Sequence, residues 1–161
     1  MHPRQEMLRF VRSYIGGKVP HACFKGTFPL DNMPARWSGD DLAQALEARL
    51  RARFGSSRTT NKWFRPVWNV LTELSGKRFI VCLTRSRFEA DEWVLLVGAL
   101  DTPFLFGGVF GRKSFEYIPK LKLVTGEIHM LLAQMAGISR LRWYFEGADS
   151  SVATPDELSW T

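Results

Sequence analysis

The sequence predicts an α+β fold in one domain of 161 residues. Helical periodicity characterises the first half of the chain, whereas runs of β-branched and aromatic residues follow Gly76. Helices that precede the strands, and do not alternate with them, favour α+β over a doubly wound parallel sheet. We therefore expect N-terminal helices packed on a mostly antiparallel sheet of about four strands. One further helix is expected in the C-terminal half.

The chain is expected to begin with a helix and a long connection. Residues 3–15 place Met7, Phe10, Val11, Tyr14 and Ile15 on one helical face, and two glycines follow as a stop. Residues 18–37 contain three prolines at irregular spacing. This composition indicates a connection with at most one short strand.

Residues 40–54 give the clearest helical pattern. Ser38 or Asp40 is a suitable N-cap, and Gly55 follows the last turn. Three arginines lie in its second half: Arg49 and Arg53 lie beside the apolar face, whereas Arg51 points away from it. The apolar face consists of Leu42, Ala45, Leu46, Leu50 and Phe54.

A second helix that ends at Ser75-Gly76 is expected after the polar stretch GSSRTTNK. Pro66 is a favoured first-turn residue, so this helix includes residues 66–76, and an earlier start at Ser57 or Thr60 stays open. Two helices followed by strands is the order of a winged-helix DNA-binding domain. The length of the helix at residues 40–54 and the position of Pro66 both argue against that domain.

The second half of the chain is expected to hold the sheet. A helix begins there at Pro119 or Thr125 and ends near Gly137, and a capping box at Thr154 starts one helical turn. Residues 147–161 are expected to form a loosely packed tail of the single domain, residues 1–161. Strands are expected at residues 78–84, 92–100, 104–110 and 139–146.

The positive charge is concentrated in one half of the chain. The formal net charge is +6, and residues 1–75 hold 12 Lys/Arg against 6 Asp/Glu, whereas the remainder is neutral. This asymmetry indicates an acidic partner for the N-terminal half, either nucleic acid or an acidic protein, unless the arginines only solvate the surface. The residues expected to bind it are Arg49, Arg51, Arg53, Arg58, Lys62, Trp63, Phe64 and Arg65.

The stretch LFGGVFGRKSFEY suggests a phosphate-binding loop, but its spacing excludes one. The motif requires a glycine directly before the lysine, and Arg112 stands there instead. A glycine-weakened strand that leads into a basic turn explains these residues more simply. Arg112 and Lys113 remain candidates for a secondary anion contact.

No catalytic or metal-binding pattern is evident in the sequence. His21 and His129 are each expected to be structural, and Glu127 lies only two residues from His129, so the two do not face each other on a helix. Cys23 and Cys82 lack the paired spacing of a zinc site. The carboxylates of Glu89, Asp91 and Glu92 are expected to form a solvated loop. We expect no cofactor and no metal.

Three functions are compatible with these patterns. The first is a non-enzymatic cytoplasmic protein whose basic half binds nucleic acid or a nucleoprotein complex. The second is an inhibitor or immunity-type protein that covers an acidic protein partner through Arg and Trp anchors. The third is an enzyme whose site is not recognisable. No membrane span is expected, and the sequence does not specify an oligomeric state.

Overall fold

The computed structural model describes residues 19–26, 39–61, 67–85, 91–99, 111–145 and 150–160. In chain order these residues form one strand, one helix, four strands, a second helix, a sixth strand and a short 3-10 helix. The expected helix at residues 3–15 and the expected strand at residues 104–110 lie outside the described residues.

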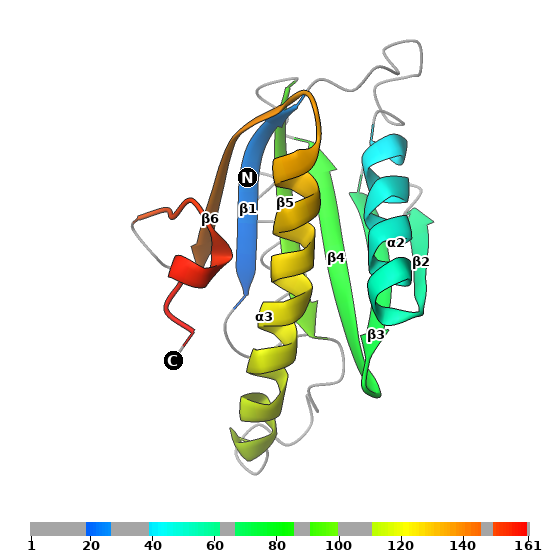
Figure 1. The fold of residues 1–161 in the computed structure, drawn as a ribbon, viewed down its shortest axis with the longest axis vertical. Helices are drawn as coiled ribbons and strands as arrows, with labels where there is room; N and C mark the ends of the chain where they lie inside the picture. Colours follow the sequence, from blue (N-terminus) through cyan, green and yellow to red (C-terminus); the bar gives the residue numbers. More distant parts are fainter. Residues whose placement is uncertain are drawn as a thin grey trace.

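The strands form one six-stranded sheet in the order β2-β3-β4-β5-β1-β6 (Figure 1). Every neighbouring pair is antiparallel, so the α+β class is confirmed, although the sheet has more than the expected four strands. The strand bounds are β1 Pro20–Gly26, β2 Ser57–Asn61, β3 Val67–Leu74, β4 Lys77–Arg85, β5 Glu92–Ala99 and β6 Ile138–Phe145.

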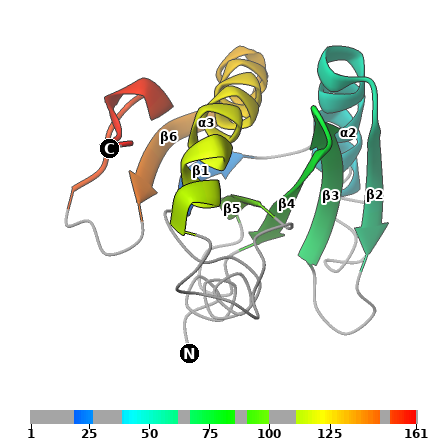
Figure 2. The same cartoon turned by 90° about the horizontal axis from the view of Figure 1, so that it is seen from below.

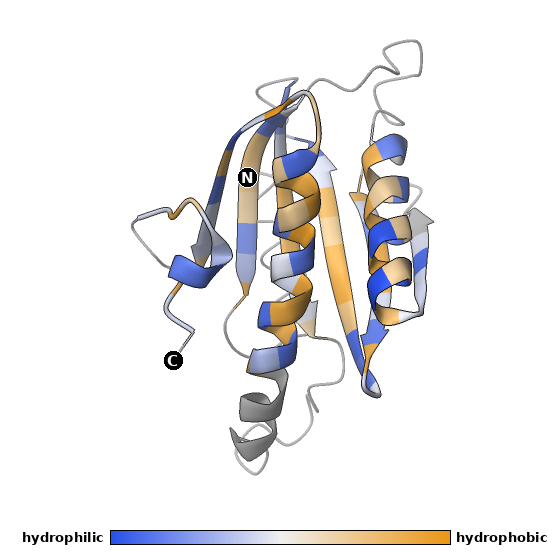
Figure 3. Cartoon of the chain, in the orientation of Figure 1, coloured by the Kyte–Doolittle hydropathy of each residue, from blue (hydrophilic) through white to orange (hydrophobic). Residues whose placement is uncertain are grey.

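Both long helices, α2 (Asp40–Phe54) and α3 (Gly111–Gln134), lie on the same face of the sheet (Figure 2). The main core fills the space between them and the strands. It contains large aromatic side chains that are almost fully buried, together with the leucines of α2, and Figure 3 shows β4 apolar along most of its length. The largest of these side chains are Trp68, Trp93, Trp143, Phe24 and Phe79.

The helix α2 confirms the expected range. Leu42, Leu46 and Leu50 have no exposed surface, and Gly55 adopts the left-handed conformation that ends the helix, with φ of 86°. The N-cap is Gly39, neither Ser38 nor Asp40. A Cβ atom at residue 39 would lie 2.7 Å from the Trp68 ring, so the close approach of that ring requires glycine.

The expected second helix is wrong: strand β2 (Ser57–Asn61) occupies its earliest possible start, and strand β3 (Val67–Leu74) occupies the rest of its described range. The segment VWNVLTEL alternates between the two faces of the sheet and pairs with β2 and β4 along its length. Ser75 and Gly76 both have positive φ, which is the geometry of a two-residue hairpin turn and not of a helix stop. The winged-helix interpretation fails with this helix.

The strand β1 lies inside the long N-terminal connection and is placed between β5 and β6. The sequence allowed one short strand there but did not indicate that it lies inside the sheet, next to the edge strand β6. The irregularly spaced prolines do not predict a strand, because this strand is stabilised by pairing with β5 and β6, which are distant in the sequence.

The helix α3 begins at Gly111, earlier than the expected Pro119 or Thr125, and tolerates Pro119 within its length. The predicted basic turn is therefore helical: Arg112 and Lys113 lie in the first turn of α3. The helix ends at Gln134, and Gly137, with φ of 87°, redirects the chain into β6 as expected.

The C-terminal residues 150–160 pack beside β6. Val152 pairs with Trp143 through two backbone hydrogen bonds, and the 3-10 helix η3 (Pro155–Glu157) follows. Thr154 is the N-cap of this helix, but its hydroxyl bonds the Glu157 carboxylate at 3.2 Å and caps no backbone N–H, so the expected capping box is not formed. Leu158 and Trp160 are buried in the main core, and Trp160 packs edge-on against Phe145.

Candidate partner surface on helices α2 and α3

Two arginines of α2 extend towards α3 and share one carboxylate there. Arg49 Nε lies 3.1 Å from Glu127 Oε2, and Arg53 Nε lies 3.0 Å from Glu127 Oε1. Each guanidinium therefore donates a charge-assisted hydrogen bond to a different oxygen of the same side chain. Glu127 is 20% exposed, whereas Arg49 and Arg53 are 37% and 59% exposed, so both guanidiniums reach the surface.

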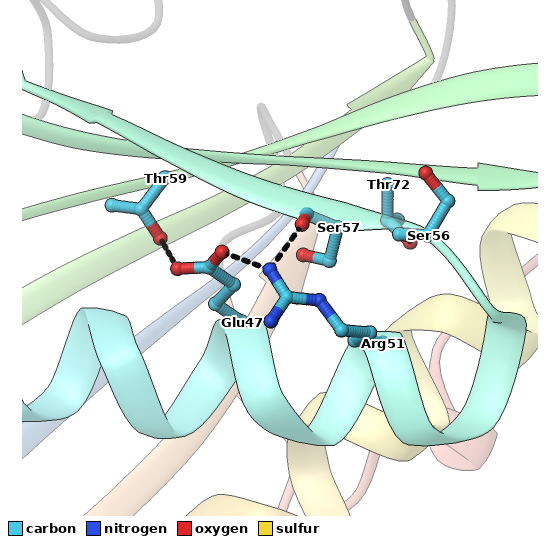
Figure 4. Close-up of polar contacts among 6 residues, drawn as sticks. All are labelled: Glu47, Arg51, Ser56, Ser57, Thr59 and Thr72. Atoms are coloured by element: carbon cyan, nitrogen blue, oxygen red, sulfur yellow. Dashed lines mark hydrogen bonds and ion pairs between the residues drawn. The ribbon is translucent and has the colours of Figure 1, made fainter.

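The third arginine, Arg51, extends to the other side of α2, towards the edge strand β2 (Figure 4). Its guanidinium pairs with Glu47 one helical turn earlier and donates to the Ser57 carbonyl at 2.8 Å. The other oxygen of Glu47 accepts a hydrogen bond from the Thr59 hydroxyl at 2.8 Å. These contacts attach α2 to the edge of the sheet, where unpaired backbone groups otherwise invite pairing with another chain.

The expected binding residues are thus divided among separate places. Arg49 and Arg53 face α3, Arg51 faces β2, and Arg58 is exposed opposite Leu71 on the sheet face away from the helices. Two carboxylates contact the three arginines of α2, which reduces the positive potential there. The predicted residues Lys62, Trp63, Phe64 and Arg65 lie outside the described residues.

The histidines lie on opposite sides of the sheet. His21 is fully buried in β1 and its ring stacks on Tyr144 at 5.1 Å between centroids. His129 lies on α3, where its Nδ1 accepts a hydrogen bond from Trp143 Nε1 at 3.0 Å. Burial lowers the pKa of His129 below its usual 6.5, although the nearby Asp156 carboxylate acts in the opposite direction.

The acidic cluster does not form a metal centre within the described part of the chain, where no group of three His, Cys, Asp or Glu side chains is suitably placed. Asp91 lies 3.9 Å from Lys25 at the start of β5, and Glu89 is outside the described residues. Cys23 and Cys82 do not form a disulfide. His21, His129 and Asp91 therefore do not converge on one site.

The feature that the sequence analysis missed is the outward side of α3. Leu123 and Met130 are 55% and 47% exposed, and Gly126 between them has open space where a Cβ atom would stand. Their separation of seven residues places both on one side of the helix. In Figure 3 apolar colour also appears on the side of α3 that faces away from the sheet.

These residues adjoin the arginine pair. Glu127 follows Leu123 by four residues and precedes Met130 by three, so the carboxylate that holds Arg49 and Arg53 lies beside both apolar side chains. We define the partner surface as Arg49, Arg53, Leu123, Gly126 and Met130. Assigning Ile128, Leu131, Leu132 and Met135 to the core would have left Leu123 and Met130 on the opposite side of α3, which is the signal that locates them.

Comparison with protein-family models, with curated proteins and with solved structures found no match to this chain. Among the described residues, no helix is both long and apolar enough to span a membrane.

Proposed function

We propose that this protein is a non-enzymatic binding protein that docks an acidic protein partner on the partner surface. The observation that carries the proposal is the exposure of Leu123 and Met130 beside two arginines that a shared carboxylate holds in place. Apolar side chains at the centre with arginine beside them are typical of protein–protein interfaces. Gly126 lets a partner backbone approach α3 closely.

The electrostatics of this surface favour an acidic partner. Glu127 carries one negative charge against the two positive charges of Arg49 and Arg53, and the whole chain has a net charge of +6. Such a field accelerates association with an acidic protein and disfavours basic ones. Because Arg49 and Arg53 are already oriented, less side-chain entropy is lost when a partner carboxylate replaces or joins Glu127.

Site-specific photo-cross-linking tests the proposal in the cells from which the protein comes. A photoreactive residue at position 123 is expected to give one discrete cross-linked protein that persists after nuclease treatment and disappears with Met130→Glu. The matched control places the same residue at position 44, which is exposed on α2 outside the partner surface. Equal cross-linking patterns at positions 123 and 44 would contradict the proposal.

A second candidate function is nucleic-acid binding, which the charge asymmetry of the chain favours. Arg58 is exposed on the far side of the sheet, and the predicted residues Lys62, Trp63, Phe64 and Arg65 follow it closely in the sequence. Binding would weaken steeply as salt increases, because neutralised phosphates release counterions. Absence of a mobility shift with both duplex and single-stranded probes at low salt would exclude this candidate.

A further inference from the structure

The sheet face away from α2 and α3 carries a second apolar cluster. Ile80, Cys82 and Leu96 are at most 8% exposed, Leu71 packs against them, and Val19 completes the cluster. Register places these strand residues on the opposite side from Phe79, Val81, Leu95 and Val97, which belong to the main core. No helix or strand among the described residues lies over this second face (Figure 2).

This face has the composition of a covered surface. A row that crosses five neighbouring strands contains Asn69, Cys82, Leu96, His21 and Tyr144, and the first four are at most 3% exposed. If this face were in contact with solvent, its side chains would instead be mostly polar and exposed. We call these row residues, with the second apolar cluster, the far face.

The chain itself points to the occupant of the far face. Val19, the residue at which the described structure begins, is 1% exposed and belongs to the second cluster. Four Cα–Cα steps join residue 15 to Val19, so the chain allows residue 15 to lie at most about 14 Å from that cluster residue. We propose that residues 3–15 form an amphipathic helix that docks on the far face through Met7, Phe10, Val11, Tyr14 and Ile15.

The dimensions of the two surfaces are compatible. A helix of 13 residues is about 20 Å long, and the four strands from β3 to β1 cover about 14 Å at their usual spacing. The apolar side of residues 3–15 would face the cluster, leaving Arg9 on the outer side in water. Docking thus turns the two-layer domain into a helix–sheet–helix sandwich, independently of the partner surface on α2 and α3.

Thiol accessibility tests the docking in the full chain. Cys23→Ser leaves Cys82 as the single thiol, and Cys82 is 1% exposed on the far face. Phe10→Asp is expected to raise the rate of Cys82 alkylation by about tenfold or more, because the covering segment is released while the main core persists. Gln5→Asp changes the charge equally on the opposite side of the helix and is expected to leave the rate unchanged. Equal rates in the two variants would overturn the proposal.

A second measurement remains decisive if Phe10→Asp prevents folding. In the Cys23→Ser background, cysteine is placed at position 7, 10 or 14 and, as a control, at position 5, and a short bifunctional maleimide is added. Docking predicts an intramolecular cross-link to Cys82 from at least one of the first three positions and none from position 5. Absence of every intramolecular cross-link, or cross-links only between two chains, would overturn the proposal in favour of another segment or a second copy.

Discussion

The two faces of the sheet are built from the same strands but by different means. On the helix-bearing face, Trp68, Trp93 and Trp143 fill the space beneath α2 and α3 with large aromatic surfaces. On the far face, a smaller cluster of Ile80, Cys82 and Leu96 lies among buried polar side chains such as Asn69 and His21. The first face is expected to carry most of the stability, whereas the second can lose its cover while the domain remains folded.

Substitution of two adjacent residues of β4 tests this difference most directly. Phe79 points to the main core and Ile80 to the far face. Phe79→Ala is expected to lower the free energy of unfolding by about 3–5 kcal/mol, and Ile80→Ala by about 2 kcal/mol, since the cavity in the smaller cluster collapses more easily. Urea denaturation followed by circular dichroism measures both, and a larger loss for Ile80→Ala would contradict the assignment.

Two glycine substitutions are expected to change the stability of the protein in opposite directions. Gly39→Ala brings a methyl group within 2.7 Å of the Trp68 ring and is expected to cost about 1–3 kcal/mol. Gly126→Ala meets open space in the interior of α3 and is expected to stabilise the protein by about 0.5–1 kcal/mol. Thermal and urea unfolding of the pair check the signs; stabilisation by Gly39→Ala would show that Trp68 shifts freely.

The ion pairs of α2 are expected to contribute less to the free energy of unfolding than the packing of the core side chains does. Glu127→Gln removes the charge that holds Arg49 and Arg53, and Glu47→Gln removes the charge beside Arg51. Each is expected to cost no more than about 1 kcal/mol, because the arginines are partly exposed, with Glu127→Gln the larger. Both losses should shrink when unfolding is measured at about 1 M NaCl, where exposed charges are screened. Undiminished losses would instead indicate buried hydrogen bonds.

The smallest expected effect is the pH dependence at His129. Its pKa is lower in the folded protein than the unperturbed 6.5, so the unfolded state binds more protons once the pH falls below that value. The stabilisation is complete above about pH 6.5 and decreases as the pH falls towards the folded pKa. The decrease in unfolding free energy from about pH 7.5 to 5.5 should be smaller in His129→Gln, whose amide oxygen still accepts from Trp143. An equal decrease in both proteins would refute this origin.

Several elements were predictable because their signals are local. The helix α2 was evident from leucines at helical spacing with Gly55 after the last turn, and β6 from the alternation of Leu141, Trp143 and Phe145. The hairpin of β3 and β4 was missed because Ser75-Gly76 ends a helix or closes a two-residue turn equally well. Pro66, a favoured first-turn residue, then favoured the wrong choice, although the β-branched residues of VWNVLTEL suit a strand that pairs with β2 and β4.

The candidate site was predictable only in part. The sequence placed Arg49 and Arg53 beside the apolar face of α2, where they needed a partner or solvent, but nothing local identified Glu127, which lies 78 residues after Arg49. Likewise, no function was assigned to Leu123 and Met130 from the sequence, although they lie opposite the side of α3 that carries its core residues.

By itself, the sequence determined the α+β class, the range of α2, the final strand and the excess of positive charge, because each depends on spacing or composition within one segment. Only the tertiary structure decided that six strands form one sheet, that β1 lies inside it and that two arginines share one carboxylate. These features depend on contacts between residues far apart in the chain. Their free energy is gained only when the whole sheet closes, so no short stretch of sequence records them.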